Sequence, residues 1–126
     1  MSPRTPVPAV DVLLIEDDDV LCTLLIHALR GRDLAVDVAD DVVESKRLLS
    51  RNLYKVALID LVLRDGDGYE VIDFIRSSGP TDMHSIVITG TDSSALGQLD
   101  RSVAKNVFFK PLDVEHLAGF VQMLTR

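Results

Sequence analysis

Polar residues at four separated places in the chain could together bind a metal ion and handle a phosphoryl group. Carboxylates that converge either raise one another's pKa or hold a cation, and a site with few protein oxygen ligands suits Mg²⁺. An ammonium group and a hydroxyl stabilise charge on a phosphoryl group, and an aspartate can be the nucleophile that forms an acyl phosphate. The residues concerned are the acidic run Glu16-Asp17-Asp18, then Asp60, Thr89 and Lys110. They predict phosphoryl transfer onto Asp60 beside a bound Mg²⁺.

Each of these places lies at or just after the end of a short apolar run. Runs of about four apolar residues, separated by helix-length segments, are typical of buried parallel strands. In an open α/β sheet, ligands bind beyond the carboxyl ends of the strands. We therefore expect the polar residues to form one site. The runs are residues 12–15, 56–59, 86–88 and 107–109.

Five strand-then-helix units can be traced along the chain. Strict alternation of strands and helices predicts a parallel sheet with right-handed crossovers and helices on both faces. Gly31 suits a left-handed end for the first helix, whereas Gly97 weakens the pattern of the fourth. The expected strands are 10–15, 35–39, 55–60, 85–89 and 106–109, and the expected helices are 19–30, 42–50, one that contains 71–75, one at about 94–103, and one that contains 117–124.

Two strand orders are common for such a sheet, and the sequence favours one of them. A dinucleotide-binding order calls for a G-x-G-x-x-G turn after the first strand, but an acidic run stands there and would repel a pyrophosphate. The flavodoxin-like order 2-1-3-4-5 brings Asp17 and Asp60 together at the switch point. It also places Thr89 and Lys110 beside Asp60. We therefore expect a flavodoxin-like, doubly wound α/β domain with five parallel strands and five helices.

Composition and charge argue against several classes of function. With 126 residues, 47% of them hydrophobic, the chain suits a single domain with a sizeable core. Its formal net charge of −7 argues against direct nucleic-acid binding, which needs a basic face. No apolar stretch approaches the ~20 residues of a membrane span. We expect residues 1–9 to be a flexible lead-in and residues 10–126 to be the domain, in the cytoplasm, with the single cysteine Cys22 reduced.

Each polar residue also has a simpler structural explanation. The acidic run could cap a helix, because acidic side chains stabilise a helix N-terminus. Asp60 could belong to a turn, Thr89 to a strand interior, and Lys110 to the surface. Asp67-Gly68 is most simply a turn that leads into a helix. Because the candidate residues fall at the ends of four different strands, a common site is the better interpretation.

These motifs make the chain resemble the receiver domain of response regulators, over about residues 10–125. The matching stretches are 12–18, 57–68, 86–90 and 108–112. The resemblance implies that Asp60 accepts a phosphoryl group from a phosphohistidine on a sensor histidine kinase or a histidine phosphotransfer protein. It implies a phosphoprotein of two-component signal transduction that works in a phosphorelay, loses its phosphoryl group by its own hydrolysis, and is not a turnover enzyme.

The resemblance also assigns the metal ligands. Asp17 and Asp60 would bind Mg²⁺ directly, and Glu16 mainly through water. The main-chain carbonyl of Val62 would be a further ligand.

The phosphoryl oxygens would be bound by Thr89 and Lys110, and the Lys110–Pro111 bond would be cis. Two positions depart from the family pattern. Arg64 replaces the usual proline after the acceptor, and Val107 stands where the family has an aromatic residue that swings inward on phosphorylation. A valine cannot make that rotation, so the switching mechanism does not follow from the resemblance.

The chain ends at Arg126, directly after the last expected helix, so no output domain is expected in it. Output would come from a downstream protein that docks on the face made by the fourth helix, the fifth strand and the fifth helix; the oligomeric state stays open. Two alternatives remain. One is a non-phosphorylated receiver-like interaction module, which Val107 favours. The other is a phosphohydrolase with an aspartyl-phosphate intermediate, which lacks a second acid because Leu61 and Val62 follow Asp60.

Overall fold

The computed structural model describes residues 10–78, 82–90 and 96–126, so the expected lead-in at 1–9 lies outside the described residues. Strands and helices alternate along these residues, except for one small hairpin after the third strand and the turns at 96–103 between the last two strands. The elements are β1 (Val12–Ile15), α1 (Asp19–Arg30), β2 (Val36–Ala39), α2 (Val42–Arg51), β3 (Val56–Asp60), β4 (Val62–Leu63), β5 (Gly66–Asp67), α3 (Gly68–Ser78), β6 (His84–Thr89), β7 (Ala104–Phe109) and α4 (Val114–Leu124).

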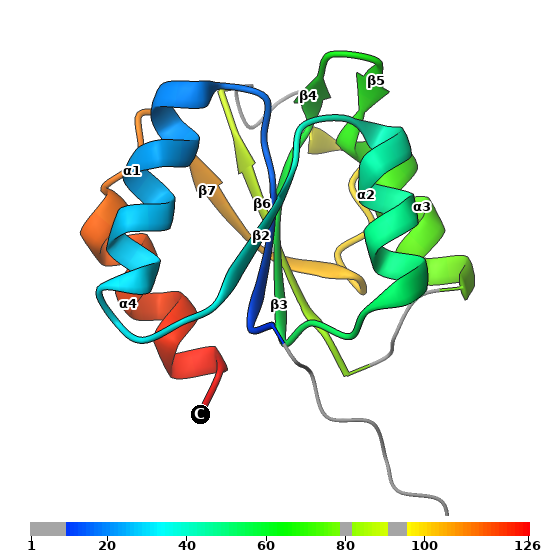
Figure 1. The fold of residues 1–126 in the computed structure, drawn as a ribbon. Helices are drawn as coiled ribbons and strands as arrows, with labels where there is room; N and C mark the ends of the chain where they lie inside the picture. Colours follow the sequence, from blue (N-terminus) through cyan, green and yellow to red (C-terminus); the bar gives the residue numbers. More distant parts are fainter. Residues whose placement is uncertain (1–9, 79–81, 91–95) are drawn as a thin grey trace, which may run out of the picture.

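Five parallel strands form the central sheet in the order β2-β1-β3-β6-β7. Counted along the chain, these are the second, first, third, fourth and fifth long strands, which is the expected order. Helices α1 and α4 cover one face of the sheet, and α2 and α3 cover the other (Figure 1). The hairpin β4–β5 lies at the edge of the sheet where the parallel strands end, and no sequence pattern predicts it.

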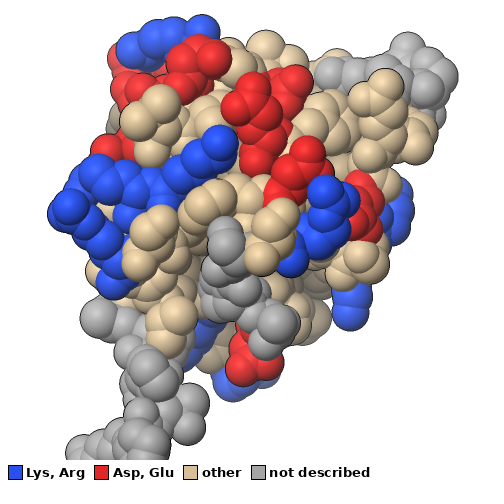
Figure 2. Space-filling model, turned by 90° about the vertical axis from the view of Figure 1, so that its right-hand side faces the viewer, with Lys and Arg blue, Asp and Glu red and all other residues tan. Residues whose placement is uncertain are grey.

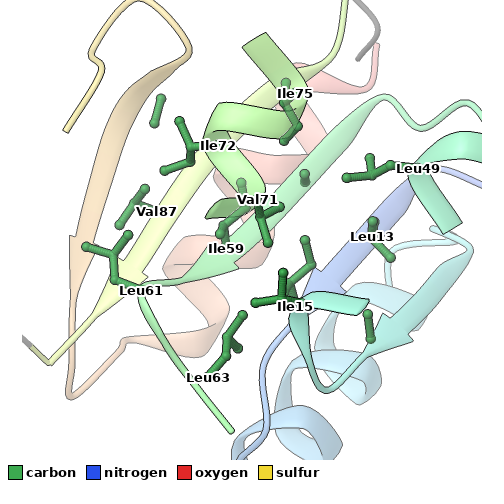
Figure 3. Close-up of a cluster of buried hydrophobic side chains, with 14 of the residues drawn as sticks. Leu13, Ile15, Leu49, Ile59, Leu61, Leu63, Val71, Ile72, Ile75 and Val87 are labelled. Atoms are coloured by element: carbon green, nitrogen blue, oxygen red, sulfur yellow. The ribbon is translucent and has the colours of Figure 1, made fainter. Parts of the chain in front are cut away.

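Alternation along the strands divides the core into two clusters. Successive side chains of a strand point to opposite faces, so strands covered by helices on both faces are apolar throughout. In β1, Leu13 and Ile15 face α2 and α3, whereas Val12 and Leu14 face α1 and α4. Figure 3 shows the first cluster, in which the side chains of two helices and the sheet meet. Its labelled members are Leu13, Ile15, Leu49, Ile59, Leu61, Leu63, Val71, Ile72, Ile75 and Val87.

Helix α1 begins with a cap and buries the only cysteine. The Asp18 carboxylate accepts hydrogen bonds from the backbone N–H groups of Val20 and Leu21, at 3.0 and 3.1 Å, which satisfies two of the donors that a helix start leaves open. Cys22 is free and buried, and its Sγ lies 3.4 Å from the carbonyl oxygen of Glu16. The thiol is therefore buried against the backbone of the acidic run.

The expectation of five helices is wrong for the described part of the chain, which contains four. Residues 94 and 95 lie outside the described residues, and 96–103 form turns. Gly97 costs about 1 kcal/mol relative to alanine in a helix. The Asp100 side chain also binds the backbone N–H of Ser102 at 2.9 Å and Arg76 at 3.2 Å. A short polar side chain that binds the local backbone competes with helix formation in this way.

The expected left-handed end of α1 at Gly31 is also wrong. Gly31 has φ of −63°, within the right-handed region. The left-handed residue is Asp33, with φ of 62°, and aspartate tolerates this conformation better than most residues. The left-handed residue after α1 therefore lies two positions later than the glycine indicates.

The face covered by α2 and α3 carries acidic and basic side chains in adjacent groups (Figure 2). Several form ion pairs, among them Arg64 with Asp40 at 3.6 Å and Lys46 with Glu70 at 4.0 Å. Exposed pairs contribute about 0–1 kcal/mol each, so this face is stabilised mainly by the apolar cluster beneath it.

Among the helices that the structure describes, none combines the length and hydropathy that a bilayer-spanning segment requires.

Candidate functional site

Strand register brings the predicted site residues to one edge of the sheet. Ile15 of β1 pairs with Ile59 of β3, so Glu16 and Asp60 emerge level with each other at the ends of neighbouring strands. On the other side of β3, Thr89 of β6 pairs with Phe109 of β7. The residue after Phe109 is Lys110, whose backbone N–H donates to the carbonyl oxygen of Thr89 at 2.8 Å.

Three carboxylates converge at this edge. One ligand oxygen from each of Glu16, Asp17 and Asp60 can be chosen so that all lie within 4.8 Å of one another. Glu16 and Asp60 are 1% and 4% exposed, whereas Asp17 is half-buried. The surrounding hollow has a volume of about 370 Å³ and is lined by Glu16, Asp17, Asp18, Asp60, Val62, Gly90 and Lys110. It is large enough for a hydrated cation and a phosphoryl group.

Lys110 holds the two buried carboxylates together. Its Nζ lies 2.9 Å from Asp60 Oδ2 and 3.0 Å from Glu16 Oε2. Burial alone would lower the pKa of the lysine, but the hydrogen bonds to Asp60 and Glu16 outweigh it and raise that pKa above its usual value. The ammonium group therefore stays charged and offsets part of the negative charge of the site.

The environment of Glu16 suits a bound metal ion better than it suits an ion pair with one ammonium group alone. Burial, the largest influence, raises its pKa to about 7; the hydrogen bond from Lys110 opposes this, and the nearby Asp60 adds to it. Its Oε2 is buried and makes no hydrogen bond within the described chain, although it lies close to Nζ. A buried carboxylate oxygen without a hydrogen bond is costly, and a divalent ion with oxygen ligands would satisfy it.

Asp60 itself is held through its backbone neighbours. Its Oδ1 accepts the backbone N–H of Val62 at 3.0 Å, while Oδ2 faces Lys110. Gly68, at the start of α3, lies directly against the Asp60 backbone and donates its N–H to the carbonyl oxygen of Leu61 at 2.9 Å. The acceptor candidate thus has a fixed position between β3 and α3.

The remaining predicted residues lie around this group at different depths. Val62 lines the hollow, and its side chain is turned toward solvent with 65% exposure. Thr89 is fully buried at the end of β6, and the next residue, Gly90, lines the hollow. The Lys110–Pro111 bond is cis, in agreement with the resemblance.

The three residues of the acidic run have different roles, which the sequence alone does not distinguish. Glu16 and Asp17 join the carboxylate group, while Asp18 both caps α1 and lines the hollow. The capping explanation is therefore confirmed for Asp18, while a metal site at Glu16 and Asp17 stays a prediction. The close approach of Gly68 was also not foreseen, because a glycine that opens a helix after aspartate is equally typical of an ordinary turn.

Val107 lies within the sheet and packs partly buried against the cluster under α2 and α3. The two aromatic residues that follow it separate as alternation requires. Phe108 packs on Phe120 with ring centroids 5.4 Å apart, and Phe109 is 44% exposed. An aliphatic residue therefore occupies the position where the family has its mobile ring.

Replacing Lys110 by alanine is expected to lower the free energy of unfolding of the metal-free protein by about 1–3 kcal/mol at neutral pH, because Glu16 and Asp60 lose their shared buried cation. Urea denaturation with a chelator present measures the change. Lys105, an exposed residue of β7, the strand that Lys110 follows, provides the control, and its replacement by alanine should change stability by less than about 0.5 kcal/mol. Equal effects of the two substitutions would contradict the role given to Lys110.

Comparison with known proteins gives one consistent family. The family model described as "Response regulator receiver domain" matches residues 12–122. The acid tolerance regulatory protein ActR of Rhizobium meliloti is 33% identical over 123 residues, which cover 91% of this chain and 60% of ActR. The chain thus spans less than two thirds of that relative.

Solved structures agree with this match. The signal receiver domain of a Luxo repressor protein from Vibrio parahaemolyticus has a TM-score of 0.82 at 20% identity, covering 92% of this chain and 89% of that one, which establishes the fold. A response regulator protein from Burkholderia pseudomallei, solved with a phosphorylated aspartic acid, a calcium ion and citrate, is 27% identical with a TM-score of 0.76. The alignment covers 90% of this chain and 71% of that protein.

Proposed function

Because the chain belongs to the response regulator receiver domain family, we propose that Asp60 is its phosphoacceptor in a two-component phosphorelay. Receiver domains are signalling domains rather than turnover enzymes. The observation that carries the assignment is the convergence of Glu16, Asp17 and Asp60, with Lys110 Nζ 2.9 Å from Asp60 Oδ2. The Burkholderia relative, which was solved with a phosphorylated aspartic acid and a calcium ion, supports it.

In the proposed reaction a carboxylate oxygen of Asp60 attacks phosphorus. The new O–P bond forms as the P–N bond of the donor phosphohistidine breaks, and the bonding electron pair leaves with the imidazole nitrogen. Lys110 neutralises charge on the transferred group, as a preorganised cation does in phosphoryl transfer. We further propose that the Thr89 hydroxyl donates a hydrogen bond to a phosphoryl oxygen. Water would later hydrolyse the acyl phosphate within the domain.

We propose that Mg²⁺ is held directly by Asp17, Asp60 and the main-chain carbonyl of Val62, and by Glu16 mainly through water. The buried Glu16 Oε2 supports this ligand set, because it makes no hydrogen bond and shares the ammonium group of Lys110 with Asp60. When bound, the ion would neutralise the carboxylates and the negative charge of the phosphoryl group. A sensor histidine kinase or histidine phosphotransfer protein is the proposed donor, and a downstream protein is the proposed receiver of the signal.

The test is incubation of the protein with acetyl phosphate, followed by intact-protein mass spectrometry. We expect one phosphoryl group per chain in the presence of Mg²⁺ and none after chelation. Fragmentation should place that group in the peptide that contains Asp60. A wild-type protein that gains no phosphoryl group, or gains it equally with chelator, would refute the proposal.

Addition of Mg²⁺ is expected to raise thermal stability, because the ion binds the folded state and relieves repulsion among the carboxylates. At a concentration one hundred times the Kd, the gain is about 2.7 kcal/mol. The Asp17→Asn variant should lose this response, while its metal-free stability should be equal to or higher than wild type, since one charge of the cluster is gone. Differential scanning calorimetry with and without Mg²⁺ measures both quantities.

Asp18→Asn is the matched control for that variant. It removes a charge from the adjacent residue, which caps α1, and asparagine is an equally good cap. The control should therefore keep the full response to Mg²⁺. If the two variants respond alike, Asp17 is not a ligand.

A non-phosphorylated interaction module remains the second candidate function, and Val107 is the observation that favours it. With a valine packed in the sheet, the inward swing of an aromatic side chain is not available to this domain. A downstream partner whose affinity is the same for the phosphorylated and unphosphorylated protein would support this candidate.

A further inference from the structure

The turn between β4 and β5 is attached to the start of α2 through one side chain, Asp65. Its Oδ1 accepts the backbone N–H of Val42 at 2.7 Å, and its Oδ2 lies 3.3 Å from the N–H of Val43. These are the first two residues of α2. The carboxylate therefore joins two elements that are 22 or 23 residues apart in the chain.

Asp65 accepts the backbone N–H groups at the start of α2 that the side chain of the N-cap residue does not reach. The N-cap residue Asp41 accepts only the N–H of Glu44 through its side chain, at 2.7 Å. A helix start leaves four backbone N–H groups without partners inside the helix. The two carboxylates together satisfy three of them at α2, those of Val42, Val43 and Glu44. The N–H of Ser45 makes the first internal bond of the helix, to the Asp41 carbonyl oxygen at 3.1 Å. Two residues thus cap one helix, but only Asp65 belongs to the loop that follows Asp60.

The hairpin is held at its other end by the candidate acceptor. Val62, the first residue of β4, donates its N–H to Asp60 Oδ1 at 3.0 Å. In the two-stranded sheet Val62 pairs with Asp67, whose Oδ1 accepts the N–H of Glu70 in the first turn of α3. The hairpin is thus held at its turn by α2 and at its open end by Asp60 and α3.

We infer that Asp65 is a positioning residue for the phosphorylation site, which fixes the β4–β5 hairpin against α2 so that the Val62 carbonyl is presented to the metal. The inference rests on the proposed function. The N–H groups of Val42 and Val43 lower the pKa of this exposed carboxylate, because they bind its charged form. Groups that orient a metal ligand from outside typically change metal affinity 10–100-fold when they are removed.

The test compares Asp65→Ala with Asp41→Ala. Both variants remove a cap from α2, so both should lose stability to a comparable extent in urea denaturation. We expect only Asp65→Ala to weaken Mg²⁺ binding, by about tenfold. Isothermal titration calorimetry measures the affinity, since the chain has no tryptophan for a fluorescence titration. Asp65→Asn keeps one acceptor oxygen for the Val42 N–H and should recover most of the affinity.

A second measurement needs no metal. In the metal-free protein, hydrogen exchange of the Val62 amide should be faster in Asp65→Ala than in wild type and unchanged in Asp41→Ala. A role limited to helix capping predicts the same exchange in both variants. Equal Mg²⁺ affinities and equal Val62 exchange for the two variants would overturn the inference and leave the proposed function standing. A wild-type protein that does not bind Mg²⁺ would overturn both.

Discussion

Asp60→Asn is expected to abolish phosphoryl uptake from acetyl phosphate, the largest functional effect of any substitution in this chain. Asparagine has nearly the same shape, but its amide is not a nucleophile toward phosphorus. The variant keeps an oxygen that can accept the Val62 N–H, which Asp60 now binds at 3.0 Å, so the local backbone is preserved. Intact-protein mass spectrometry after incubation with Mg²⁺ and donor measures the outcome.

Asp67→Asn is the matched control, because Asp67 is an exposed aspartate of the same loop. Its side chain accepts the N–H of Glu70 at 3.1 Å, and asparagine can do the same. The control should therefore take up phosphate as wild type does. Full uptake by Asp60→Asn would show that the acceptor lies elsewhere. Loss of uptake in both variants would contradict the specific role given to Asp60.

Gly68→Ala is expected to lower the free energy of unfolding, with a direct effect on the backbone of the candidate acceptor. A Cβ at this position would overlap the carbonyl oxygen of Asp60 and lie 2.9 Å from the Cα of Leu61. Both are backbone atoms, so no side-chain rotation relieves the clash. Overpacking of this kind costs about 1–3 kcal/mol and occasionally more, which exceeds the gain of up to about 1 kcal/mol from alanine in a helix.

Urea denaturation measures this effect, and Gly97→Ala provides the control. A Cβ at Gly97 meets no atom within 4 Å, so that substitution should change stability by less than about 0.5 kcal/mol. Because the clash pushes directly on the Asp60 backbone, Gly68→Ala should also slow phosphoryl uptake. Wild-type stability of Gly68→Ala would mean that α3 can move away from β3 at little cost.

The order of the sheet and the position of the site could be predicted because both depend on local patterns. Apolar runs mark the parallel strands, and the ends of parallel strands meet at one edge. Asp60 and Lys110 could therefore be placed together although 50 residues separate them. A resemblance carried by four motifs added the roles of the individual residues.

Features that depend on competition between local and distant contacts could not be predicted. The apolar spacing of 94–103 is compatible with a helix, but Asp100 binds Ser102 and Arg76 instead. The hairpin β4–β5 has two residues in each strand, too few for any periodic pattern. The contact between Asp65 and α2 joins residues whose pairing leaves no trace in a single sequence.

The buried thiol beneath the acidic run has a practical consequence for spectroscopy. Burial, helped by the charge of Glu16, raises the pKa of Cys22 to about 12, and alkylating reagents react with the thiolate. A cysteine introduced on the surface could therefore carry a fluorophore or a nitroxide while the native one stays unmodified in the folded protein. Distances within the labelled domain could then be followed in solution without first making a cysteine-free background.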